Sequence, residues 1–91
     1  MEEVFLVKAY VMINTRPGKE TEIIKEISKM PEVSEVHRVF GPFDIVVEIK
    51  SSSMEAIVDL IFEKIRKIDG IEKTITAITA EYEIDVHDMP I

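Results

Sequence analysis

Cysteine and tryptophan are both absent from the chain, and only 3 glycines and 4 prolines interrupt its 91 residues. Without cysteine there is no disulfide framework and no thiolate metal site, and the absence fits the cytoplasmic location that we expect. No apolar stretch approaches the ~20 residues that span a bilayer, so we expect no membrane contact. The sequence also shows no Ser-His-Asp set, no Cys-His pair and no glycine-rich phosphate loop.

Basic residues are in the minority, with 11 Lys and Arg against 18 Asp and Glu and a formal net charge of −7. A nucleic-acid backbone is bound by basic surfaces, so this balance argues against direct nucleic-acid binding. The high charge content, the many isoleucines and the lack of cysteine give a thermophile-like composition.

The length of 91 residues predicts one domain, over residues 1–91. A domain of this size buries roughly 60–70% of its unfolded surface, which leaves a thin margin of stability. Apolar residues make up 46% of the chain, enough for a core and for an interface as well. We therefore expect a homo-oligomer.

The stretch from Val36 to Lys50 is the part around which the rest is organised. β-Branched and aromatic residues lie on both sides of Gly41 and Pro42, which predicts two strands joined by a sharp turn. Gly41 can adopt a positive φ, and Pro42 fixes its own φ and donates no N–H. Asp44 then lies at the mouth of the hairpin, near backbone amides. This combination is suited to holding a small zwitterion.

The other elements follow from periodicity and chain breakers. They are a strand over residues 4–15, a helix over 19–30, a helix over 54–68 and a strand over 71–84. Ser53 is the expected N-cap of the second helix, and Gly70 the left-handed residue after it. The apolar stripe of that helix is predicted to contain Met54, Ile57, Val58, Ile61, Ile65 and Ile68, widened by Leu60 and Phe62. The order predicts an α+β, ferredoxin-like βαββαβ split sandwich, with the first and third strands central.

Both helices of such a fold cover one face of the sheet, and the other face stays open. In the first strand, alternation assigns Val7, Ala9, Val11 and Ile13 to the core. In the third, it assigns Asp44, Val46, Glu48 and Lys50 to the open face and Phe43, Ile45, Val47 and Ile49 to the helix side. We expect two copies to associate through this face in a dimeric α/β-barrel arrangement, with an interface that contains Lys8, Tyr10, Met12 and Val46.

The candidate binding residues also have simpler explanations. Asp44 is suited to a ligand's ammonium group, and equally to capping backbone amides in its own hairpin. Phe43 fits a core position better than a ligand contact. Thr74 and Thr76 could offer hydroxyls to a ligand, although threonine is common in strands for its β-propensity alone. The two histidines, His37 and His87, are too isolated for a metal site, and we expect no cofactor.

With these features the chain resembles the effector-binding RAM domain of the Lrp/AsnC transcriptional regulators. The matching residues are Gly41-Pro-Phe-Asp44, as the family's G-x-x-D turn between strands two and three, and the strand that follows it. Gly70-Ile71 and Thr74-Ile-Thr76 resemble the glycine–aliphatic–threonine start of the family's last strand. The resemblance implies dimers that assemble into rings and bind amino acids near the turn. It implies an effector site formed by Gly41, Phe43, Asp44, Thr74 and Thr76.

Full-length members of that family carry an N-terminal helix-turn-helix, for which a first strand starting near Val4 leaves no room. We therefore expect a stand-alone RAM domain that senses an amino acid and modulates full-length regulators by mixed assembly. Two alternatives remain open at this point. One is a small dimeric ferredoxin-like enzyme of the monooxygenase or isomerase type, for which Tyr10, Asn14 and His37 are the only polar candidates. The other is a subunit with a purely structural role in an assembly.

Overall fold

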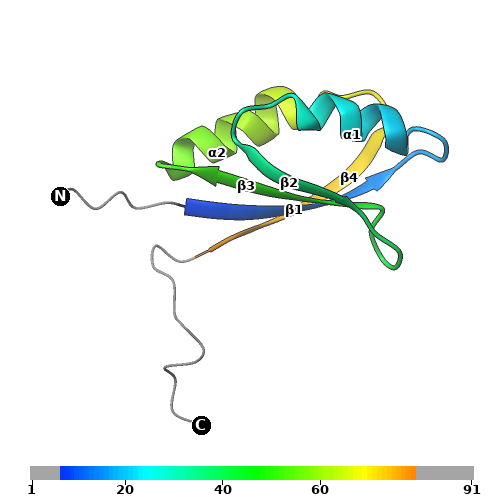
Figure 1. The fold of residues 1–91 in the computed structure, drawn as a ribbon, viewed down its shortest axis with the longest axis horizontal. Coiled ribbons are helices and arrows are strands. Elements are labelled where there is room, and N and C mark those ends of the chain that lie inside the picture. Colours follow the sequence, from blue (N-terminus) through cyan, green and yellow to red (C-terminus); the bar gives the residue numbers. More distant parts are fainter. Residues whose placement is uncertain (1–6, 80–91) are drawn as a thin grey trace, which may run out of the picture.

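The computed structural model describes residues 7–79, which form one antiparallel sheet covered on one face by helices (Figure 1). The elements are β1 (Val7–Thr15), α1 (Glu20–Ser28), β2 (Val33–Arg38), β3 (Ile45–Ser51), α2 (Met54–Leu60), the π-helical segment η1 (Ile61–Ile65) and β4 (Ile71–Ile78). The strand order is β2-β3-β1-β4, with the first and third strands in the middle. The α+β ferredoxin-like prediction is therefore confirmed. The predicted strand residues 4–6 and 80–84 lie outside the described part.

The core lies between the sheet and the helices. On the sheet side it contains the alternate residues of the two central strands, Val7, Ala9, Val11, Ile13, Ile45, Val47 and Ile49. On the helix side it contains Ile23, Ile27, Ile57, Leu60, Ile61 and Ile65. Burying one such side chain contributes about 1.5–3 kcal/mol to the stability of the fold. The alternation of apolar residues therefore determines which face of each strand meets the helices. Phe43 lies outside this core and is half-buried.

The second helical segment differs from the prediction in its regularity. Its start is confirmed, because the Ser53 side chain accepts a hydrogen bond of 3.0 Å from the Ala56 N–H. After Leu60 the helix widens, and the N–H of Arg66 donates to the carbonyl of Ile61 over 2.8 Å. The predicted apolar stripe of this helix was wrong at two positions. Met54 is 55% exposed at the first turn, and Phe62 is 52% exposed within the π-helical segment. No helix among residues 7–79 is long and apolar enough to span a membrane.

Within the two central strands, the open face carries the residues that alternation assigned to it, whereas Asp44 precedes β3. The register pairs Lys8 with Lys50, Tyr10 with Glu48 and Met12 with Val46. The four residues predicted for the dimer interface, Lys8, Tyr10, Met12 and Val46, therefore lie side by side on one face, opposite the helices.

Gly70 provides a test of how the end of the second helical segment is held. Its φ is +98°, and an added Cβ would lie 2.8 Å from the Cβ and Cγ atoms of Lys19. We predict that Gly70→Ala lowers the free energy of unfolding by about 1–3 kcal/mol in urea titrations, because it adds a clash to a strained backbone. Gly18→Ala is the control, since Gly18 has a φ of +88° but no atom within 4 Å of the added Cβ. Equal losses for the two variants would show that the contact with Lys19 has no effect.

Candidate functional site

The turn between β2 and β3 projects from one end of the sheet (Figure 1). Its ends are joined by a hydrogen bond of 2.9 Å from the N–H of Val39 to the carbonyl of Asp44. Gly41 has a φ of +135°, a conformation that a side chain would strain. The Asn14 side chain in β1 donates to the carbonyl of Pro42 over 2.8 Å. The turn is therefore held in place by the neighbouring strand.

The carboxylate of Asp44 is part of that attachment. Its Oδ2 accepts hydrogen bonds from the backbone N–H of Thr15 at 2.8 Å and from the Thr15 hydroxyl at 3.4 Å. Thr15 is buried, so its N–H would otherwise lack a partner at the end of β1. The sequence had suggested that this side chain stands free on the open face. In the structure it is instead tied to β1. Among residues 7–79, Oδ1 makes no hydrogen bond.

A hollow of about 250 Å³ lies under the turn and is lined by Glu20, Arg38, Val39, Phe40 and Asp44. The guanidinium of Arg38 lies 4.0 Å from the carboxylate of Glu20 and donates to the Thr21 hydroxyl at 3.3 Å. The hollow therefore brings one cation together with two carboxylates and the backbone of the turn. An α-amino acid carries the two complementary charges. Arg38 and Glu20 were not predicted for this site, because they come from different elements and match no spacing along the chain.

The two predicted threonines lie on another part of the molecule. Thr74 pairs with Ile13 and Thr76 with Val11, so both side chains are on the helix face of β4. They line a groove of about 540 Å³ between η1 and β4, together with Phe62, Arg66 and Ile78. β4 and β2 are opposite edges of the sheet, with β3 and β1 between them. Within one chain, β1 therefore lies between β4, which carries these threonines, and β3, which follows the turn.

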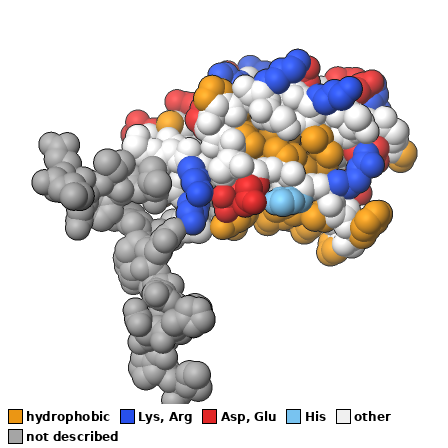
Figure 2. Space-filling view, in the orientation of Figure 1, with side chains coloured by type: hydrophobic (Ala, Val, Ile, Leu, Met, Phe, Trp, Pro, Cys, Tyr) orange, Lys and Arg blue, Asp and Glu red, His pale blue; other side chains and the backbone are white. Residues whose placement is uncertain are grey.

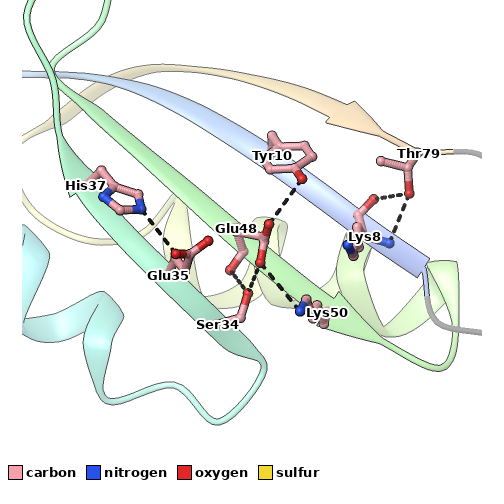
Figure 3. Close-up of polar contacts among 8 residues, drawn as sticks. All are labelled: Lys8, Tyr10, Ser34, Glu35, His37, Glu48, Lys50 and Thr79. Carbon is pink, nitrogen blue, oxygen red and sulfur yellow. Dashed lines mark hydrogen bonds and ion pairs between the residues drawn. The ribbon is translucent and has the colours of Figure 1, made fainter. Parts of the chain in front are cut away.

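The open face has a polar centre around Glu48 (Figure 3). Its carboxylate accepts hydrogen bonds from the Ser34 hydroxyl at 2.6 Å and the Tyr10 hydroxyl at 3.1 Å, and Lys50 lies 3.8 Å away. The Ser34 hydrogen bond is the main cause of a lowered pKa for Glu48, whose side chain is only 13% exposed. The hydrogen bond to Glu48 in turn raises the pKa of Tyr10.

The residues considered for an enzyme do not converge on this face. Tyr10 is bonded to Glu48 and Asn14 to the turn, whereas the His37 ring lies 3.6 Å from Glu35 near the β2 edge, where Figure 2 shows the histidine beside acidic side chains. Within residues 7–79 no group of three His, Asp or Glu side chains could hold a metal ion. His87 and its tail lie outside the described residues.

Comparison with known proteins places these features in a family. The family model of the Lrp/AsnC ligand binding domain matches residues 8–83. The HTH-type transcriptional regulator FL11 of Pyrococcus furiosus is 28% identical over 91% of this chain and 54% of its own length. An uncharacterized HTH-type regulator of Pyrococcus abyssi is 34% identical over 77% of this chain and 44% of its own. The chain thus spans about half the length of these curated relatives.

Solved structures agree with this assignment. The crystal structure of FFRP-DM1 is 35% identical, with a TM-score of 0.78 over 81% of this chain and 99% of that one. A hypothetical protein from Pyrococcus horikoshii is 32% identical, with a TM-score of 0.78 over 93% of this chain and 99% of its own. Both are small proteins of nearly the length matched here.

The hydrogen-bonded carboxylate of Glu48 predicts that the stability of the folded chain depends on pH. Because the folded-state pKa of Glu48 is lowered, its contribution to stability is complete above the usual glutamate pKa of about 4.3 and is lost as the pH falls through the folded-state value. We predict that Glu48→Gln lowers the free energy of unfolding at pH 7 and that the difference from wild type shrinks as the pH falls below about 4.3. Urea titrations across this range measure it. If the difference between Glu48→Gln and wild type stays the same at every pH, the loss of stability comes from packing and not from the charge of Glu48.

Proposed function

The chain belongs to the Lrp/AsnC ligand-binding domain family, and from this premise we propose that it senses an α-amino acid, which it binds where two copies of the chain meet. The family's members among the relatives are transcriptional regulators, so the role is regulatory and not enzymatic. One observation supports the proposal above all. The hollow under the turn sets Arg38 beside the carboxylates of Glu20 and Asp44.

The proposed binding mode assigns one group to each part of the ligand. Asp44 accepts from the ammonium group through Oδ1, because its Oδ2 is occupied by Thr15. Arg38 and the exposed backbone near Gly41 receive the carboxylate, with Arg38 moving off Glu20. The hydroxyls of Thr74 and Thr76 are assigned to the second copy, because within one chain β1 lies between β4 and the strand that follows the turn.

The fold itself is compatible with this ligand class. A transcriptional regulator from Neisseria meningitidis, whose structure is a complex with L-Met, shares the fold with a TM-score of 0.75 at 15% sequence identity. That complex concerns the Neisseria protein. For the present chain it supports only the class of ligand, and the identity of the amino acid is set by the side chains around the site.

Oligomerisation completes the proposal. We infer that the open face is the dimer interface, with Lys8, Tyr10, Met12 and Val46 at its centre, and that the dimers join further in a ring. The hydrogen bonds around Glu48 satisfy that carboxylate within one chain, so a second copy can cover it without leaving a charge unpaired. Mixed assembly with full-length regulators of the same family would then carry the amino-acid signal to transcription.

The ligand is tested through a change that keeps the turn intact. Asp44→Asn retains an oxygen that can accept from Thr15 but removes the negative charge. A hydrogen bond between charged groups contributes about 1.5–3 kcal/mol, so we predict that amino-acid affinity falls about 10- to 100-fold. Calorimetric titration measures it, using each of the twenty amino acids that raises the melting temperature in a thermal-shift screen.

Two results would contradict this assignment of Asp44. The first is an unchanged affinity in Asp44→Asn, which would remove its charge from the site. The second is the absence of any binding amino acid for the wild type, which would favour a purely structural subunit. Asp44→Ala is not a suitable variant, because it leaves the buried N–H of Thr15 unpaired and costs about 1–3 kcal/mol of stability.

The dimer interface is tested by placing a charge at its centre. We predict that Met12→Asp raises the dissociation constant of the dimer by about 100-fold, because the carboxylate would be buried between two sheets without a partner. Met54→Asp is the matched control, since Met54 is 55% exposed on the helical side of the molecule. Sedimentation equilibrium measures both. Equal effects of the two substitutions, or a monomeric wild type, would show that the open face is not the interface.

A further inference from the structure

A row of paired residues crosses the open face at the centre of the dimer interface proposed above. Met12 pairs with Val46 on one side and with Ile75 on the other. Ile75 is 41% exposed, and Met12 and Val46 are half-buried, so the row forms an apolar stripe. On β2 the next member of the row is His37, which pairs with Val46. The apolar stripe therefore ends at an imidazole ring.

The surroundings of His37 are acidic (Figure 3). Its Nε2 lies 3.6 Å from the carboxylate of Glu35 on the same strand. On β3 and just before it, Glu48 and Asp44 lie two positions to either side of Val46. Both of these carboxylates already accept hydrogen bonds within the chain. Among residues 7–79, by contrast, His37 is the only ion-pair partner of Glu35.

The other titratable groups of the neighbouring strands are engaged elsewhere or lie farther away. They are Lys50, at 3.8 Å from Glu48; Tyr10, which donates to Glu48; Lys8, which pairs with Lys50 in the register; Arg38, at 4.0 Å from Glu20 of α1; and Lys73, on β4 at the opposite edge of the sheet. The net charge of the pair formed by Glu35 and His37 is therefore set by the protonation of the histidine.

Resting on the dimer interface of the proposed function, we propose that protonation of His37 strengthens the association of two copies, so that the dimer responds to pH between about 8 and 5.5. Neighbouring strands lie about 4.8 Å apart, so a second sheet that covers Val46 also reaches the His37–Glu35 pair. A neutral imidazole leaves the covered pair with one negative charge. A protonated imidazole makes it an ion pair without net charge, which is less costly to cover than an unpaired carboxylate.

Two further effects bear on the direction of the response. Covering the pair also removes water from the imidazolium, which opposes its protonation. The same loss of water lowers the local dielectric constant and strengthens the attraction of the carboxylate 3.6 Å away. The formal net charge of −7 with neutral histidines acts in the same direction as this attraction, because two copies repel each other less once each has gained a proton. The dimer is therefore stronger at the lower pH.

The two histidines of the chain provide a variant and its matched control. We expect the dissociation constant of the wild-type dimer to fall about 10-fold from pH 8 to pH 5.5, which is about 3-fold for the ion pair of each copy. His37→Gln keeps a neutral side chain there at every pH and should lose most of this change. His87→Gln should retain it, since His87 is the only other histidine. Sedimentation equilibrium across the pH range measures all three proteins.

Glu35→Gln tests the pairing itself. Without the carboxylate, protonation of His37 places an unpaired cation in the interface, so the dimer should weaken as the pH falls. Strengthening that persists in Glu35→Gln would overturn the proposal. So would a wild-type dissociation constant that rises or stays constant as the pH falls, a change that persists in His37→Gln, or one that disappears in His87→Gln.

The interface and the histidine can fail separately. A dimer that Met12→Asp weakens, but whose dissociation constant does not change with pH, would overturn the role of His37 and leave the proposed interface standing. A dimer that Met12→Asp leaves unchanged would contradict the proposed interface, even if His37→Gln abolished its pH response. A monomeric wild type at every pH would overturn both.

Discussion

The hydrogen bond from the buried N–H of Thr15 to the carboxylate of Asp44 is the interaction on which the site depends. It closes the end of β1, which would otherwise leave a donor unpaired at the border of the core. It also fixes the β2–β3 turn to the sheet and uses only one oxygen of the carboxylate. Asp44 therefore has a structural role, and the binding role that we propose for it uses the other carboxylate oxygen. A substitution of Asp44 therefore has to keep the hydrogen bond to Thr15 if it is to test ligand binding.

The sheet divides the functional surfaces in space. The helices cover one face and form the core with it, whereas the other face offers Tyr10, Met12 and Val46 around a carboxylate whose partners lie in its own chain. The turn projects from one end of the sheet (Figure 1), and the η1–β4 groove lies along its β4 edge. The face that we propose as the dimer interface therefore does not overlap with the turn or with the groove.

The sequence predicts the elements of this structure better than it predicts the site. Alternation placed Val11 and Val47 in the core correctly, because a strand with one buried face admits only one register. Phe62 was misplaced, since a regular α-helical period does not account for a π-helical turn, which no local signal announces. Arg38 and Glu20 were missed because tertiary packing alone brings them beside Asp44. The separation of Thr74 from the turn likewise follows from strand order and not from spacing along the chain.

The central claim is that an amino acid binds at the turn through Asp44 and reaches the threonines of a second copy. Amide chemical shifts of isotope-labelled protein, followed during titration with an amino acid that raises its melting temperature, test this residue by residue. The account predicts coupled shifts at Gly41, at Asp44 with its partner Thr15, and at Thr74 and Thr76. Shifts confined to the open face around Tyr10 and Glu48, with the turn unchanged, would contradict it.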